Sequence, residues 1–130
     1  MAQSRVKSSF GFGIVGCGMI SEFHAKAIQA MKGGHLECVF SRRKKNAERI
    51  GEQFGVPWYT DYRKFLAHKG LDIVTICTPS GAHTEPSVAA AEAKKHVICE
   101  KPLEVTLARC DAIIRACARN RVVLGGVFPS

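Results

Sequence analysis

The stretch FGIVGCGMIS, residues 12–21, has the pattern of a buried strand that turns directly into a helix. Its first four residues are an apolar run, and the six that follow read G-x-G-x-x-S. Gly16 would allow the tight turn, Gly18 would let a pyrophosphate approach bare backbone, and Ser21 is small enough for close helix packing. The free N–H groups and the positive end of the helix would then face the anion. The stretch predicts a dinucleotide site inside a βαβ unit.

Apolar runs and helical patterns alternate along the rest of the chain. We expect strands at 12–15, 36–40, 56–59, 73–77, 97–99 and 122–128, and helices at 20–31, 45–54, 61–67, 84–93 and 106–120. In the first helix the apolar residues recur at the helical period, at Ile20, Phe23, Ala27, Ile28 and Met31. In the last helix one stripe holds Leu107, Cys110, Ile113, Ile114 and Cys117. This alternation predicts the α/β class, a doubly wound parallel sheet with helices on both faces.

Length and composition fit one soluble domain over residues 1–130, because 46% of the residues are apolar and 23% are charged. The formal net charge of +8 favours an anionic partner. A nucleic acid is not expected, since neither a recognition motif nor aromatic interleaving accompanies the charge. No apolar run approaches the roughly 18 residues of a membrane span, and the first nine residues lack the apolar centre of a signal peptide. We therefore expect a cytoplasmic protein without a membrane partner.

Cysteine and histidine residues show no pattern of a metal or disulfide site. The six cysteines form no C-x-x-C, and no histidine pair stands near them at zinc spacing. We interpret them as small buried side chains in a reducing compartment and expect no metal. Four histidines without a partner pattern are interpreted as surface or packing residues: His24, His35, His68 and His96.

The end of the second strand carries basic residues where a carboxylate usually binds the ribose of NAD. That acid is expected about 20 residues past the glycine turn, but residues 40–45 read FSRRKK and Glu37 lies too early in the strand. Ser41 and Arg42 could instead bind a 2′-phosphate through hydroxyl and guanidinium contacts. The alternative is a solvated charge run, although four cations at the positive end of a helix are unfavourable without an anion. The pattern favours NADP over NAD.

Two further motifs follow later strands. Residues 78–83 read TPSGAH after the strand at 73–77, and residues 99–103 read CEKPL after the strand at 97–99. Either alone also fits an ordinary polar turn, but ligands of open parallel sheets lie beyond the carboxyl ends of the strands. Together and in this order, the three motifs closely resemble the N-terminal half of the Gfo/Idh/MocA oxidoreductases, from about residue 12 to residue 128.

The resemblance implies a Rossmann domain for NAD(P), normally followed by a larger antiparallel-sheet domain that binds a sugar, an inositol or a related polyol. It implies cofactor contacts at Gly16, Gly18, Met19 and Ile20 for the pyrophosphate, Ser41 and Arg42 for the adenosine ribose, Thr78, Pro79 and His83 along the cleft, and Glu100 for the nicotinamide ribose. Lys101 is implied as a further cofactor contact, and it resembles the catalytic lysine of the family, which hydrogen-bonds a developing alkoxide or polarises a carbonyl while hydride moves.

The chain departs from the family in length, because 130 residues are less than half of the usual size. We therefore expect it to bind cofactor without turnover, and to form a homo-oligomer through apolar surface that a second domain would cover. The alternative function is a non-catalytic, dinucleotide-sensing regulatory module, since the resemblance extends to a fungal galactose-pathway corepressor without redox chemistry. Glu100-Lys101-Pro102 favours the enzyme, because a sensor has no need of the lysine.

Overall fold

A six-stranded parallel sheet forms the centre of the structure, a computed structural model that describes residues 9–16, 18–78, 84–100 and 107–127. The strands are β1 (Phe10–Val15), β2 (Gly34–Phe40), β3 (Trp58–Tyr59), β4 (Ile73–Ile76), β5 (His96–Glu100) and β6 (Leu124–Val127). They lie in the order β3-β2-β1-β4-β5-β6, and each neighbouring pair is parallel. The strand order reverses between β1 and β4, and in such sheets ligands bind at this switch point. The predicted doubly wound sheet is confirmed.

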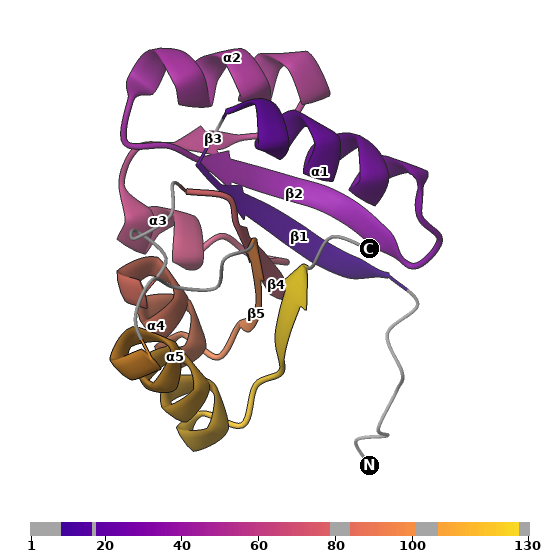
Figure 1. Ribbon diagram of the computed structural model, residues 1–130. Coiled ribbons are helices and arrows are strands. Elements are labelled where there is room, and N and C mark those ends of the chain that lie inside the picture. The colour runs from indigo at the N-terminus through magenta and orange to yellow at the C-terminus, as the bar shows by residue number, and fades with distance from the viewer. Residues whose placement is uncertain (1–8, 17, 79–83, 101–106, 128–130) are drawn as a thin grey trace.

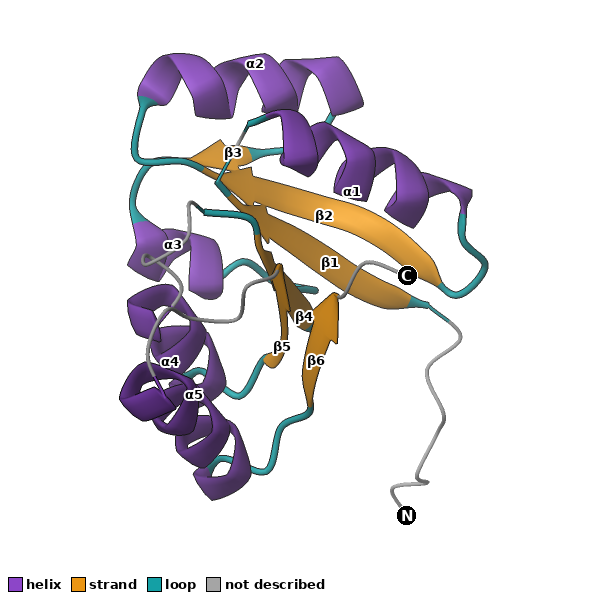
Figure 2. Cartoon of the chain, viewed as in Figure 1, coloured by secondary structure: helices purple, strands orange, loops and turns teal. Residues whose placement is uncertain are grey.

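Helices cover both faces of the sheet (Figures 1 and 2). On one face lie α1 (Met19–Ala30) and α2 (Lys44–Phe54), and on the other lie α3 (Tyr62–Leu66), α4 (Thr84–Glu92) and α5 (Leu107–Arg119). The apolar core is correspondingly split into two clusters. One includes Ile14, Ala25 and Ile50 and the other includes Phe65 and Ile113. The five predicted helices are therefore present. The two helical layers pack on the sheet whose carboxyl ends carry the candidate site.

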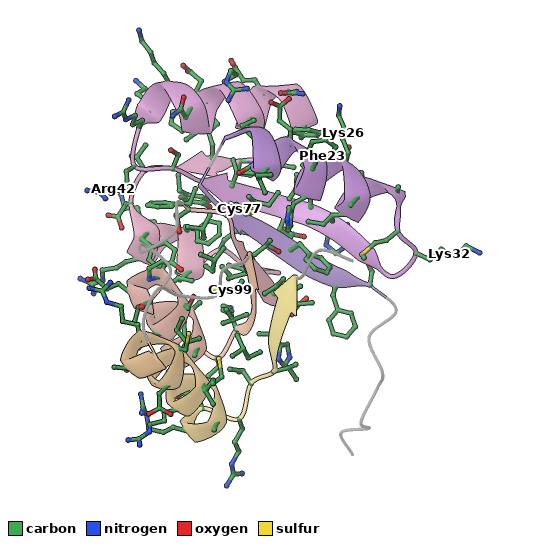
Figure 3. The ribbon with its side chains drawn as sticks, in the orientation of Figure 1. Phe23, Lys26, Lys32, Arg42, Cys77 and Cys99 are labelled. Atoms are coloured by element: carbon green, nitrogen blue, oxygen red, sulfur yellow. The ribbon has the colours of Figure 1, made fainter. Side chains whose placement is uncertain are left out.

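The buried face of α1 differs from the predicted one. Ser21, Ala25 and Ile28 are buried, whereas Phe23 is 68% exposed and Ile20 and Met31 are 45% exposed. The apolar spacing predicts the helix correctly but not its buried side, because the glycine turn sets the rotation of α1 and places Ser21 against the sheet. An apolar stripe is left on the outside of α1, where Figure 3 labels Phe23. Self-association, predicted through the surface that a second domain would cover, stays a prediction.

The last helix shows the same kind of difference. Ile113, Ala116 and Cys117 are buried in α5, but Ile114 is 50% exposed. A helix has 3.6 residues per turn, so neighbours such as Ile113 and Ile114 lie about 100° apart and cannot both face the sheet fully. The stripe predicted for α5 is therefore only partly the buried face.

Two predicted helix boundaries are confirmed by their end geometry. Asp61 precedes α3, and its carboxylate accepts hydrogen bonds from the backbone N–H groups of Arg63 and Lys64, at 3.0 and 3.2 Å. Gly55 ends α2 in the left-handed region, with φ of 68°. A third helix end, after α4, places Lys94 in the same region with φ of 64°, where glycine is the more common residue.

The described cysteines are free thiols: Cys38, Cys77, Cys99, Cys110 and Cys117. Cys38, Cys99 and Cys117 are buried, and burial raises the pKa of the Cys38 thiol to about 12. That thiol stays protonated at neutral pH and packs as a small apolar side chain. No helix in the described part of the chain is both long and apolar enough to cross a membrane.

Candidate functional site

The turn after β1 brings the glycine motif to the carboxyl end of the sheet. Gly16 has φ of 89°, and a Cβ built on it would lie 3.1 Å from the carbonyl carbon and oxygen of Cys77, just after β4. Its backbone N–H donates to the carbonyl oxygen of Phe40, the last residue of β2, at 2.8 Å. The turn thus lies between the ends of β2 and β4. Gly16 is needed both for its backbone conformation and for the close approach.

Ser21 holds this turn against the first turn of α1. The side chain is completely buried. Its Oγ accepts a hydrogen bond from the backbone N–H of Gly18 at 3.2 Å and donates one to the carbonyl oxygen of Gly16. Sequence reasoning predicted only that Ser21 is small. The structure adds that its hydroxyl cross-links the two glycines of the motif, a role that glycine or alanine at this position would not fill.

Gly18 presents open backbone at the start of α1. Its φ of −103° is ordinary for any residue. Apart from its chain neighbours, no described residue has a heavy atom within 4 Å of the position that a Cβ would take. Met19 and Ile20 follow as the first residues of α1, where backbone N–H groups have no acceptor within the helix. The space beside Gly18, together with these donors and the positive helix end, fits a pyrophosphate.

The two residues predicted to flank the adenosine ribose differ in exposure. Ser41 is 6% exposed. Its N–H donates to the carbonyl oxygen of Tyr59 at 3.1 Å, and its Oγ accepts from the N–H of Arg43 at 3.3 Å. Arg42 is exposed and extends outward beyond the end of β2 (Figure 3). Ser41 therefore shapes the turn into α2, while the side chain of Arg42 is exposed at the end of β2.

A pocket of about 570 Å³ adjoins Arg42 at the carboxyl ends of β1, β2 and β4. Phe40 and Tyr62 contribute aromatic rings to its lining, with centroids 5.0 Å apart. The Tyr62 hydroxyl donates to the carbonyl oxygen of Pro86 at 2.7 Å, which joins α3 to the first turn of α4. Burial raises the pKa of Tyr62, so the phenol stays protonated and keeps this bond. Thr78, predicted as a cleft residue, also lines the pocket.

The remaining predicted site residues are only partly placed. Glu100 is the last residue of β5 and lies in register with Val127 of β6, at the carboxyl end of the sheet. Pro79, His83 and Lys101 lie outside the described residues. The structure thus brings Gly16, Gly18, Met19, Ile20, Ser41, Arg42 and Thr78 to the same end of the sheet around the switch point.

Sequence reasoning missed a hydrogen-bonded chain of side chains centred on Glu37. The carboxylate contacts His35 Nε2 at 2.7 Å and His68 Nε2 at 2.8 Å. His35 Nδ1 lies 2.6 Å from the hydroxyl of Ser9, and His68 Nδ1 lies 2.7 Å from that of Tyr59. His35 and His68 were interpreted as surface or packing residues, and the structure adds that both are hydrogen-bonded to Glu37. A single acid within the otherwise apolar run of β2 was the available signal.

The electrostatics of this chain follow from the two imidazoles. Partial burial by itself raises the pKa of Glu37. Hydrogen bonds from His68 and His35, together with the charges of these imidazoles, lower it by a larger amount, so the pKa lies below its ordinary value. Glu37 stands in the middle of β2, away from the glycine turn, so its contacts cross-link β2 to the segment after α3. Among the described residues, no group of three or more His, Cys, Asp or Glu side chains is arranged to hold a metal ion.

Comparisons with known proteins agree with this geometry. A family model described as an oxidoreductase family with an NAD-binding Rossmann fold, Gfo/Idh/MocA, matches residues 10–127. Myo-inositol 2-dehydrogenase of Thermotoga maritima is 32% identical over 113 residues, which are 86% of this chain and 34% of that protein. Inositol 2-dehydrogenase of Salmonella typhimurium is 33% identical over 111 residues, 83% of this chain and 33% of that protein.

Solved structures show the same likeness. The WlbA dehydrogenase from Bordetella pertussis, in complex with NADH and UDP-GlcNAcA, superimposes with a TM-score of 0.87 at 28% identity, over 92% of this chain and 37% of that one. KijD10, a 3-ketoreductase from Actinomadura kijaniata in complex with TDP-benzene and NADP, gives a TM-score of 0.85 at 27% identity, over 92% and 38%.

The matches cover most of this chain but only part of each relative. The chain spans about a third of the length of the curated relatives it matches. In this chain the residues that match the family model, 10–127, include the glycine turn, the strands at the switch point and Arg42. The chain belongs to the Gfo/Idh/MocA oxidoreductase family and contains its NAD-binding Rossmann fold.

Proposed function

We propose that residues 1–130 form a single NAD(P)-binding Rossmann domain of an oxidoreductase, which transfers hydride between a nicotinamide cofactor and a sugar, inositol or polyol-type substrate. The observation that carries the cofactor part is the open backbone of Gly18 at the start of α1, beside the switch point of the sheet. The inositol dehydrogenases among the relatives and the UDP-GlcNAcA bound to WlbA support the substrate class.

The described residues would hold the cofactor by its phosphates and its adenosine end. The N–H groups of Met19 and Ile20 would bind the pyrophosphate at Gly18, and Arg42 would contact the adenosine ribose. The nicotinamide cofactor supplies the hydride chemistry when bound. Lys101 is proposed as the catalytic residue, whose ammonium donates a hydrogen bond to the developing alkoxide. Pro79, His83 and Glu100 are proposed to contact the nicotinamide half.

We propose NADP as the preferred cofactor. Structural neighbours bind NADH in one case and NADP in another, so the fold accepts both. In this chain an exposed Arg42 stands where an acid would repel a 2′-phosphate. Arg42→Ala is expected to weaken NADPH binding about tenfold, or ~1.4 kcal/mol, and to change NADH binding little. Equal loss for both cofactors, measured by fluorescence titration, would leave Arg42 without a role in the preference.

A substitution at Gly18 tests the pyrophosphate site without disturbing the fold. Gly18 has an ordinary φ and open space around its Cβ position, so Gly18→Ala should leave the melting temperature unchanged. The added methyl group projects into the space that the pyrophosphate would enter, so affinity for NADPH and NADH should fall by about tenfold or more. Gly55→Ala, at the far end of α2, is the control and should keep full affinity. An unchanged affinity in Gly18→Ala would overturn the proposed site.

We also propose a cytoplasmic location, supported by the free thiols of the described cysteines, which suit a reducing compartment. The alternative of a dinucleotide-sensing regulatory module shares the cofactor site and differs in having no use for Lys101. Activity measurements, rather than cofactor binding, distinguish the regulatory module from the enzyme.

A further inference from the structure

The pocket beside Arg42 extends further than the predicted cofactor contacts. Its lining passes from Phe40 at the end of β2 to the first turn of α4, and then to Arg109 in the first turn of α5. Figure 1 shows α4 and α5 on the face of the sheet opposite α1 and α2. Arg109 thus reaches the pocket from a different element than Arg42 does, and none of the sequence motifs includes it.

The charged groups that line the pocket favour an anion. Arg42 and Arg109 each carry a permanent positive charge, and Glu85 is the acidic residue in the described lining. The first turns of α2 and α5 contain no acidic residue. Two arginines and one glutamate leave the described lining with an excess of positive charge. The pocket therefore suits a ligand that carries a negative group.

The orientation of a bound dinucleotide identifies that negative group. With the pyrophosphate at Gly18, the adenosine ribose lies beyond the end of β2, where this fold places its 2′-hydroxyl. A phosphate on the 2′-oxygen would enter the pocket beside Arg42. It would carry a charge of about −1.5 to −2 and offer oxygen acceptors in more than one direction. Guanidinium groups bind such oxygens through paired hydrogen bonds.

We propose that Arg109 is a second specificity-determining residue for NADP, which contacts the 2′-phosphate from α5 while Arg42 contacts it from the end of β2. This inference rests on the proposed function, since it concerns the adenosine end of the same cofactor. Glu85 supports the selectivity, because its carboxylate counters part of the positive charge and leaves less attraction for ligands without the extra phosphate. The aromatic lining from Phe40 and Tyr62 offers a surface for the adenine ring.

Two half-cofactors test the proposal on the whole chain. Adenosine 2′,5′-bisphosphate and 5′-AMP differ only in the 2′-phosphate, and calorimetric titration gives the dissociation constant of each. Arg109→Ala should weaken binding of the bisphosphate about tenfold and change 5′-AMP binding less than about twofold. Arg109→Lys should recover part of the loss, because it keeps the charge without the paired hydrogen bonds. Arg42→Ala combined with Arg109→Ala should lose less than the sum of the single effects, since both contact one group.

Arg115→Ala is the matched control, because Arg115 stands on the exposed side of α5 in an ion pair with Asp111 at 2.7 Å, outside the pocket lining. It should bind both nucleotides as the unmodified chain does. If Arg109→Ala weakens both nucleotides equally, or behaves like Arg115→Ala, the inference fails and the proposed function stands. If the unmodified chain binds neither these half-cofactors nor NADPH, the proposed function fails and the inference fails with it.

Discussion

At the scale of single residues, Glu37 shows how side chains far apart in sequence create a local environment. An ionised carboxylate can only accept hydrogen bonds, so His35 and His68 both present Nε2–H to it. Their Nδ1 atoms can then accept from the hydroxyls of Ser9 and Tyr59 when the rings are neutral. The resulting chain joins the residue before β1 to β2, β3 and the segment after α3 through polar contacts.

Glu37→Gln is expected to destabilise the fold in a pH-dependent way. The pKa of Glu37 is lowered in the folded chain from an ordinary value of 4.5. A lowered pKa contributes stability that is present above the unfolded value and lost as the pH falls through the folded value. The variant should therefore lose about 1–2 kcal/mol in free energy of unfolding at pH 7, from weakened charge-assisted hydrogen bonds. The loss should shrink below about pH 4.5 and approach zero in stronger acid.

Urea denaturation at pH 7 and at pH 3.5 measures this difference. Glu52→Gln is the control, because Glu52 is exposed on α2, and it should change the free energy of unfolding by less than about 0.5 kcal/mol at either pH. A Glu37→Gln penalty that is the same at both pH values would mean that packing, rather than charge, accounts for the effect.

Residues that act through local backbone rules are the ones that sequence analysis predicts best. Gly16 and Asp61 depend on a few neighbouring residues. The predicted turn is found at Gly16, and Asp61 caps the helix that was predicted over residues 61–67. The bonds of Glu37 to His68 cross 31 positions and depend on the final packing of β2 against the segment after α3. No spacing rule in the sequence links such residues, so this cluster was missed.

At the scale of secondary-structure elements, periodicity identified the helices but not always the side that is buried. In α1 the apolar residues cover two sides, and the ones against the sheet are selected by the glycine turn that precedes the helix. Ser21 must lie over Gly16 and Gly18 to make its hydrogen bonds, which turns Phe23 outward. The side a helix buries therefore depends on how its first turn is anchored, which apolar spacing alone does not describe.

Two helix ends with the same backbone conformation should respond to substitution in opposite directions. Gly55 after α2 and Lys94 after α4 have φ of 68° and 64°. A Cβ at Gly55 would meet no heavy atom of the described part of the chain within 4 Å, apart from its chain neighbours. Gly55→Ala therefore isolates the conformational cost and should lower the free energy of unfolding by about 1 kcal/mol. Lys94→Gly removes that conformational cost and should raise the free energy of unfolding by up to about 1 kcal/mol.

The second change also removes a hydrogen bond from Lys94 Nζ to Asn120 Oδ1, at 2.9 Å, but this contact is exposed and contributes little. Thermal melts of both variants, with Lys94→Ala as a reference that keeps the strained conformation, give the comparison. Stabilisation by Lys94→Ala as large as that by Lys94→Gly would show that the side chain, and not φ, is responsible.

At the scale of the whole molecule, the strand order follows from the sequence more directly than the site does. Alternating strands and helices, right-handed connections and a glycine turn after the first strand together leave few arrangements other than a doubly wound sheet. The site depends in addition on which side chains at the turns are not already hydrogen-bonded within the turn. Ser41 illustrates this, since its position was predicted correctly while its hydroxyl is used within the turn to α2.

The 130-residue chain is expected to bind NADPH without oxidising or reducing a substrate. Its described pocket lies at the adenosine end of the proposed cofactor site, and the chain spans about a third of its relatives. Holding a substrate against the nicotinamide can account for roughly 7–11 kcal/mol of a reaction barrier. Lys101 alone would supply a hydrogen bond to the reacting oxygen but neither that positioning nor shielding from water.

The measurement is NADPH formation from NADP⁺, and NADH formation from NAD⁺, with a panel of inositols, polyols and sugars at saturating cofactor. Cofactor binding is confirmed first in the same preparation, so that an inactive chain is distinguished from an empty one. Lys101→Ala is the control for activity, and its cofactor affinity is measured beside that of the unmodified chain. Turnover that disappears in Lys101→Ala would contradict the expectation, because it would require these 130 residues to orient a substrate on their own.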